Sequence, residues 1–157
     1  MKPKVYIETT IISYLIARPS RDLIVAAHQQ ITRDWWDLRR VEFDLFVSRL
    51  VIQEASAGDR EAAQRRLAEL DPIPLLDFTE DALSLARHLV YRGVLPGTAA
   101  EDALHIAVAT VHGMDYLLTW NCRHIASARM RQAVGATCAL RGYEPPVICT
   151  PEELVGD

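Results

Sequence analysis

The segment Thr98–Ile125, TAAEDALHIAVATVHGMDYLLTWNCRHI, contains a helical pattern, a short reversal and an apolar run in direct succession. Thr98 and Glu101 have the S/T-x-x-E spacing of a capping box, which predicts a helix that begins at Ala99. Small residues recur on one face of this helix, so the helix can pack closely on a sheet. Gly113 is expected to end it. The segment therefore predicts a helix followed closely by a strand.

The apolar run at residues 116–119 is typical of a short strand buried on both faces. This order places Asp102 in the first turns of a helix and Asn121 directly after a strand. In an open α/β sheet, residues at both positions usually lie at the ligand-binding edge and not in the hydrophobic core. Asp102 and Asn121 are therefore the first candidates for functional residues.

Short apolar runs that indicate strands occur five times, at residues 4–7, 44–47, 73–76, 116–119 and 147–148. Helical patterns separate them, and Pro72 and Pro74 favour an edge position for the third run. This alternation predicts a parallel, about five-stranded sheet with helices on both faces, which is a three-layer α/β/α sandwich. The 157 residues are most simply one domain. A second capping box, Thr150 to Glu153, predicts a final helical turn.

The pattern that starts at Arg21 predicts a long helix with an apolar stripe facing the core. Its members recur at helical spacing: Leu23, Ala27, Ile31, Trp35 and Leu38. Because Trp35 and Trp36 are adjacent, one of them is expected to leave the stripe. Packing at the edge of the stripe is the first explanation for that indole, and a contact with a partner is the second.

Composition excludes several classes of protein. The three cysteines are odd in number and lack C-x-x-C spacing, so neither a disulfide framework nor a zinc site is indicated. No apolar run is long enough to span a membrane. Glu8 interrupts the first apolar run, so a signal peptide is not expected either. A reducing cytoplasm fits these features best.

The formal net charge of −4 argues against a general nucleic-acid coat protein. The distribution of charge is more informative, because no Asp or Glu occurs between Tyr116 and Tyr143. Four arginines lie in that segment: Arg123, Arg129, Arg131 and Arg141. Two interpretations remain open, a face that contacts phosphates and an ordinary solvated helix face.

Four polar residues stand where this layout would bring side chains together: Glu8, Glu54, Asp102 and Asn121. If the first and fourth strands are neighbours, the chain leaves them in opposite directions and a crevice opens at their carboxyl ends. Three carboxylates there would repel one another unless a cation or shared protons offset them. Oxygen ligands without a His or Cys cluster favour Mg²⁺ or Mn²⁺ over zinc. Such a cation can polarise a phosphodiester and generate hydroxide.

Each candidate also has a structural explanation. Glu8 and Glu54 can be exposed acids at the end of a strand and on a helix surface. Asn121 suits the N-cap of the turn at residues 122–125. Glu101 is explained by the first capping box, and Thr9 by capping the helix after the first strand, so both are secondary candidates. The histidines His105 and His124 lack the paired spacing of a metal site, and packing or surface roles are expected, although His124 could contact a phosphate.

Four segments, VYIETTIISYL, FVSRLVIQEASAGD, AAEDALHIAVATVHGMDYLLTWN and NCRHI, resemble the successive blocks of the PIN domain. They are most similar to the subgroup akin to the VapC toxins of bacterial and archaeal toxin–antitoxin modules. The resemblance extends over nearly the whole chain, in order, and implies a single PIN domain at residues 1–157. It further implies a metal-dependent endoribonuclease with acidic residues clustered at the carboxyl edge of the sheet.

By the same resemblance the first acid falls on Glu8, the second on Glu54, the third on Asp102 and the fourth position on Asn121. The family usually has Asp at the first and fourth of these positions. Because the side chain of Glu8 is one methylene longer than that of Asp, its carboxylate must fold back or the metal must shift. Asn121 can offer an amide oxygen but adds no charge, so a second metal site is expected to be weaker.

The resulting expectation is an endoribonuclease that uses Mg²⁺ or Mn²⁺, bound by Glu8, Glu54 and Asp102, with Asn121 helping to place metal or water. Arg123, His124 and Arg129 are expected to contact RNA. The expected partners are an RNA substrate, a small antitoxin and a second copy of the chain, with Trp35 or Trp36 at the contact between copies. The alternatives are a non-catalytic PIN-like module that binds RNA or protein, and a nuclease or esterase acting on DNA ends or small phosphate esters.

Overall fold

The structure is a computed structural model that describes residues 1–155. Within this range, five short strands form one sheet: β1 (Lys4–Ile7), β2 (Asp44–Ser48), β3 (Leu75–Leu76), β4 (Tyr116–Leu118) and β5 (Val147–Cys149). Their order is β3-β2-β1-β4-β5, and every neighbouring pair is parallel. The predicted parallel sheet is thus confirmed, with the third strand at an edge.

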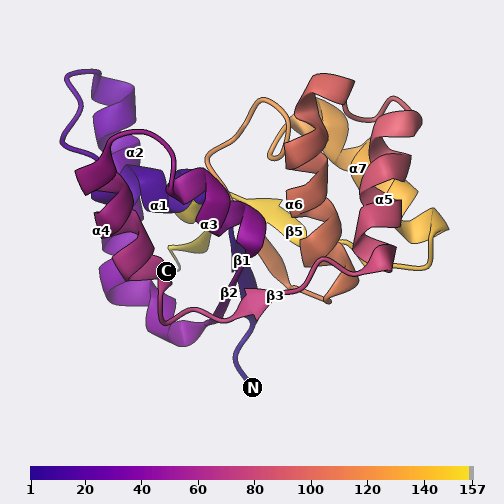
Figure 1. The fold of residues 1–157 in the computed structure, drawn as a ribbon, viewed down its shortest axis with the longest axis horizontal. Helices are drawn as coiled ribbons and strands as arrows, with labels where there is room; N and C mark the ends of the chain where they lie inside the picture. Colours follow the sequence, from indigo (N-terminus) through magenta and orange to yellow (C-terminus); the bar gives the residue numbers. More distant parts are fainter. Residues whose placement is uncertain (156–157) are drawn as a thin grey trace.

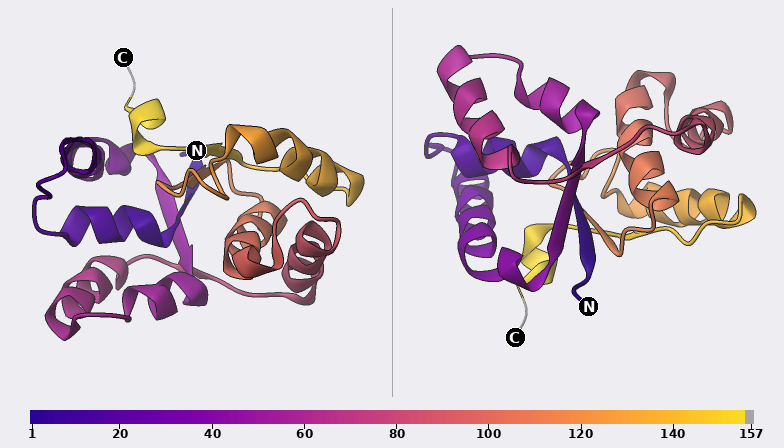
Figure 2. Two further views of the ribbon diagram at one scale, coloured as in Figure 1. Left: turned by 90° about the horizontal axis from the view of Figure 1, so that it is seen from above. Right: turned by 60° about the horizontal axis from the view of Figure 1, so that its bottom comes forward.

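Seven α-helices lie within the described residues: α1 (Thr9–Ile16), α2 (Leu23–Asp34), α3 (Arg49–Ala55), α4 (Arg60–Leu70), α5 (Glu80–Tyr91), α6 (Ala100–Val111) and α7 (Ala128–Leu140). Helices α1 to α4 lie on one side of the sheet and α5 to α7 on the other (Figures 1 and 2). The predicted three-layer α/β/α arrangement is confirmed. Among the described helices, none has the length and apolar character that crossing a bilayer requires.

The central strand β1 is the point at which the direction of the chain changes. The segments after β1 build the sheet outward through β2 and β3, and the chain then crosses to the other side of β1 to form β4 and β5. A switch point of this kind is where a crevice is expected, and here it falls at the carboxyl ends of β1 and β4. Ile7 pairs with Leu118, which brings the residues that follow these two strands side by side.

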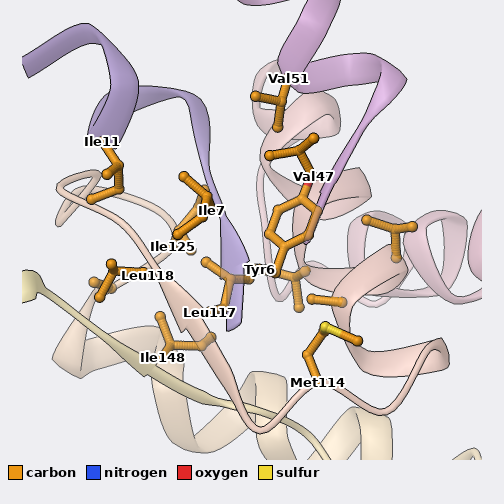
Figure 3. Packing of buried hydrophobic residues seen from close by; sticks show 14 of the residues in the cluster. Tyr6, Ile7, Ile11, Val47, Val51, Met114, Leu117, Leu118, Ile125 and Ile148 are labelled. Carbon is orange, nitrogen blue, oxygen red and sulfur yellow. The ribbon is translucent and has the colours of Figure 1, made fainter. Parts of the chain in front are cut away.

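The central strands are buried on both faces, as their apolar sequences predict. Tyr6, Ile7, Leu117 and Leu118 have no solvent exposure. Figure 3 shows these side chains packed with residues from helices on either side of the sheet. This packing fixes the ends of β1 and β4, and hence the polar residues beyond them.

The capping box predicted at the start of α6 is wrong. The backbone already turns at residues 97–99, where a 3₁₀ turn closes with a 2.8 Å bond from the Ala99 N–H to the Pro96 carbonyl. Helix α6 consequently begins at Ala100, and its N-cap, Ala99, has no side chain that can accept a bond. Glu101 is thereby freed from a capping role. The second box, at Thr150, is confirmed.

The apolar stripe predicted for α2 is wrong at both ends, since Leu23 is 86% exposed and Leu38 is 70% exposed. A π-helical turn, Trp35–Arg39, follows α2 and adds a residue to the helical repeat. The changed phase turns Trp35 and Trp36 inward together and Leu38 outward. Because both indoles are buried, neither provides the surface contact expected between copies of the chain.

Candidate metal and catalytic site

The four residues predicted to converge come from four elements around the carboxyl ends of β1 and β4. Glu8 directly follows β1, and Asn121 lies three residues beyond the end of β4. Glu54 lies in α3, and Asp102 lies in the first turn of α6. The condition that the first and fourth strands are neighbours is met, because β1 pairs with β4. The hydrogen bonds described below divide these residues into three acid-centred groups.

Glu8 is 4% exposed and is held by two threonine hydroxyls. Its Oε1 accepts hydrogen bonds of 2.5 Å from Oγ1 of Thr10 and of Thr119. The backbone N–H of Trp120 donates to Thr10 Oγ1 at 2.8 Å, and that of Asn121 donates to Thr119 Oγ1 at 2.9 Å. Because a backbone N–H can only donate, both hydroxyls are left to direct their protons at Glu8. The alternative of an exposed acid at a strand end is therefore wrong for Glu8.

Glu54 is half-buried and also receives two donors on one oxygen. Its Oε1 lies 2.5 Å from Thr9 Oγ1 and 2.7 Å from His105 Nε2. Burial disfavours the ionised form, but hydrogen bonds from His105 and from the Thr9 hydroxyl favour it, and the pKa of Glu54 lies below its usual value. The pKa of Glu101 is raised, because its exposed carboxyl lies in hydrogen-bond contact with Glu54 and is repelled by that charge.

His105 is a residue of this site that sequence reasoning missed. The side chain has no solvent exposure, and its Nδ1 lies 2.7 Å from the hydroxyl of Tyr6, which in turn lies 2.8 Å from Ser48 Oγ. Burial raises the pKa of Tyr6 far above its usual value, so the phenol keeps its proton. The signal was present in the sequence, because His105 follows Asp102 by three residues and Glu101 by four, which places all three on adjoining parts of one helix face.

Asp102 forms the third group. Its Oδ1 accepts a 3.1 Å bond from the amide Nδ2 of Asn121, and its Oδ2 lies 2.9 Å from Nδ1 of His124. The oxygen of the Asn121 amide accepts the backbone N–H of His124 at 3.1 Å. Asn121 therefore caps the turn at residues 122–125, as the structural explanation predicted, and orients Asp102 with its other end. His124 pairs with Asp102 rather than projecting freely toward solvent.

The donor set fits a divalent cation bound mainly by oxygen. Ligand atoms of Glu8, Glu54 and His105 all lie within 4.8 Å of one another. Both ring nitrogens of His105 already have partners, whereas Glu8 Oε2 accepts no bond from the described residues and is not fully buried. Carboxylates with free lone pairs suit Mg²⁺ or Mn²⁺. Asp102 belongs to the adjoining group and is not within this closest set.

Among the described residues, only some of the arginine side chains beyond Asn121 are free of hydrogen bonds to the protein itself. Arg123 and Arg129 are exposed. Arg131 and Arg141 donate instead to groups of the protein itself, a backbone carbonyl and a serine hydroxyl. Of the four arginines, Arg123 and Arg129 thus remain the better candidates for contact with phosphates.

No protein-family model matches the sequence, and no curated protein matches it. Among solved structures, a chain from the crystal structure of VapBC2 from Rickettsia felis, bound to a DNA fragment from their promoter, is similar over 94% of this chain and 98% of its own length. The TM-score is 0.59 and the sequence identity 17%. The fold is PIN-like. The resemblance of the sequence blocks to VapC-type PIN domains is thereby confirmed at the level of the fold.

The path of the backbone in this fold accounts for the positions of the three acids, although the overall sequence identity to the similar structure is only 17%. At 17% identity few side chains are shared, so the likeness concerns the path of the backbone. That path brings the carboxyl ends of β1 and β4 together with α3 and α6, the elements that carry Glu8, Glu54 and Asp102. The chemistry possible at the carboxyl edge of the sheet therefore depends on the residues of this chain and not on its fold.

Proposed function

We propose that this chain is a divalent-metal-dependent endoribonuclease of the VapC type and acts as the toxin of a toxin–antitoxin pair. The observation that carries the proposal is the approach of Glu8 and Glu54 at the switch point of the sheet, with Asp102 of α6 in the adjoining group. Hydrogen bonds fix all three carboxylates, as a site that must place charge accurately requires.

Glu8, Glu54 and Asp102 would hold Mg²⁺ or Mn²⁺ through lone pairs that their hydrogen bonds leave free. A divalent ion there supplies Lewis acidity toward the phosphodiester and lowers the pKa of bound water. Asn121 acts on this chemistry by orienting Asp102 through its amide N–H. Thr9 acts in the same way on Glu54.

The substrate is proposed to be RNA, bound along the exposed arginines Arg123 and Arg129. Guanidinium groups pair well with phosphate oxygens, and such contacts set affinity and register without choosing a sequence. His124 is proposed to act mainly through Asp102, since its Nδ1 is already bonded to that carboxylate. By resemblance to VapC toxins, the products are a 5′-phosphate and a 3′-hydroxyl.

The test is Mn²⁺-dependent cleavage of a structured RNA by the purified chain, beside an EDTA control and the Asp102→Asn variant. Asp37→Asn is a matched control, because Asp37 is an exposed acid of the π-helical turn with no hydrogen bond from its side chain within the described residues. Cleavage that survives in Asp37→Asn and is lost in the other two supports the proposal. Cleavage by Asp102→Asn at the wild-type rate would remove Asp102 from the site.

Other results would favour the rival functions. A folded chain that binds no Mn²⁺ would favour the non-catalytic PIN-like module. Equal cleavage of single-stranded DNA and RNA would favour the broader phosphodiesterase. Binding of Mn²⁺ without cleavage of several RNAs would indicate a narrow choice of substrate.

We further propose that residues 1–157 act as a single cytoplasmic domain with a small antitoxin as partner, and that the chain forms a homodimer. The similar solved structure is a VapBC2 assembly, which supports the antitoxin. The antitoxin is expected to cover the crevice at β1 and β4 together with the early helices. Co-expression with a short upstream gene, followed by light scattering of the complex and of the free chain, tests both partners.

A further inference from the structure

We propose that Tyr6, Ser48 and His105 form a buried positioning network that fixes the Glu54 carboxylate for the metal. The inference rests on the proposed function, since it concerns the same site. It adds three residues that touch neither substrate nor metal and that act through Glu54.

The order of the protons in this network follows from the capacity of each group. The carboxylate of Glu54 can only accept, so His105 Nε2, 2.7 Å away, carries a proton. In a neutral imidazole the other nitrogen is then an acceptor, so Tyr6 donates its hydroxyl proton to Nδ1 across 2.7 Å. Ser48 Oγ, 2.8 Å from the phenol oxygen, can therefore donate to Tyr6. Every proton points toward Glu54.

The network joins three separate elements beneath the site. Tyr6 lies in β1, Ser48 ends β2, and His105 lies in α6. All three side chains have no solvent exposure. The ring of Tyr6 packs within the hydrophobic cluster, close to Val47 (Figure 3). Polar groups in such a place are costly unless each is satisfied, and a fully satisfied network holds its members in one arrangement.

This arrangement determines which part of Glu54 can face a cation. Oε1 already receives the Thr9 hydroxyl and the His105 N–H, so its position is set from two directions. Rotation of the carboxylate would break both bonds at once. The ring of His105 is itself held by the Tyr6 hydroxyl, so the orientation of Glu54 depends on a group in the core of the sheet. Outer partners of this kind typically change metal affinity by about 10- to 100-fold when they are removed.

Tyr6→Phe tests the network, because it keeps the ring and removes only the hydroxyl. Calorimetric titration of the metal-free variant with Mn²⁺ should show affinity about 10-fold or more below that of the wild type. Thr110→Val is the matched control: it removes a buried hydroxyl from the same helix α6, bonded at 2.7 Å to the Ile106 carbonyl and not to the site. Thr110→Val should bind Mn²⁺ as the wild type does, even if it melts at a lower temperature.

A second pair of variants separates positioning from simple packing. His105→Gln keeps an N–H that can reach toward Glu54, whereas His105→Leu removes it, so the Gln variant should retain more Mn²⁺ affinity. If Tyr6→Phe does not fold, Ser48→Ala removes the outermost donor and should weaken Mn²⁺ binding in the same direction. In the metal-free wild type, ¹⁵N shifts should show that the neutral form of His105 is the tautomer protonated at Nε2 and bare at Nδ1.

The outcomes distinguish this inference from the proposed function. Wild-type Mn²⁺ binding that is unchanged by Tyr6→Phe would overturn the network and leave the nuclease intact. The opposite His105 tautomer would overturn the proton order. A wild type that binds no Mn²⁺ would overturn the proposed function and, with it, the role assigned to these three residues.

Discussion

Thr119→Val should destabilise the metal-free protein, and part of the loss should depend on the charge of Glu8. Thr119 is fully buried, and its hydroxyl donates to Glu8 Oε1 at 2.5 Å. Valine has nearly the same shape, so the substitution removes the hydroxyl without opening a cavity. What is lost is a buried bond to a charged group and the acceptor of the Asn121 N–H.

The size of the effect follows from these two bonds. A hydrogen bond to a charged group contributes about 1.5–3 kcal/mol, and an ordinary one about 0.5–1.5 kcal/mol. Asn121 is only half-buried, so water can replace part of the second bond. The expected loss in the free energy of unfolding is therefore roughly 2–4 kcal/mol. For a domain of this size, that corresponds to a fall in Tm of about 5–15 °C.

Urea unfolding at pH 7 with EDTA, on the wild type, Thr119→Val, Glu8→Gln and the double variant, measures the coupling. With the charge removed in Glu8→Gln, the loss caused by Thr119→Val should shrink to roughly 1–2.5 kcal/mol, the value of two neutral bonds, because the bond from the Asn121 N–H is lost in both backgrounds. Thr137→Val is a control at a buried threonine of α7 whose hydroxyl makes no hydrogen bond among the described residues, so it should lose much less stability than Thr119→Val. An equal loss in both Glu8 backgrounds would refute a charge-assisted hydrogen bond from Thr119 to Glu8.

Three further results are expected. Glu8→Asp introduces the acid usual in the PIN domains that the sequence resembles, but it withdraws the carboxylate from both threonine hydroxyls, so Mn²⁺ affinity measured by calorimetry should fall. Glu101→Gln should raise the free energy of unfolding in urea at pH 7, and this gain should vanish by pH 4. The pKa of Glu101 is raised in the folded protein, so its ionisation destabilises the fold as the pH rises, and glutamine does not ionise. A thiol reagent at pH 8 should label one cysteine of the native chain, the exposed Cys122, and all three after denaturation, because burial raises the pKa of Cys138 and raises that of Cys149 to about 12.

The layout of the fold could be predicted from sequence because it depends on local periodicity. Short apolar runs gave all five strands, and the alternation with helices gave the parallel sheet. Gly113 ends α6 with a positive φ of 70°, a conformation that favours glycine. These signals need no knowledge of distant contacts.

The errors arose where tertiary contacts outweigh local patterns. Spacing alone made Thr98 a cap, but the 3₁₀ turn before α6 moves the helix start past it. A helical repeat of constant phase placed Leu38 inside, whereas the π-helical turn after α2 rotates it outward. His105 was assigned to packing because its partners, Tyr6 and Glu54, are 99 and 51 residues away in sequence. No local pattern reports bonds across such separations.

The same long-range bonds change the argument about charge at the sheet edge. Sequence reasoning required a cation or shared protons to offset three carboxylates. In the structure each acid receives two side-chain partners: Thr10 and Thr119 on Glu8, Thr9 and His105 on Glu54, and Asn121 and His124 on Asp102. An aspartate at position 121 would place a second carboxylate against Asp102 in place of the donor now 3.1 Å away. Asn121 thus adds no charge beside Asp102 and donates a hydrogen bond to that carboxylate, which makes this edge of the sheet compatible with a stable fold.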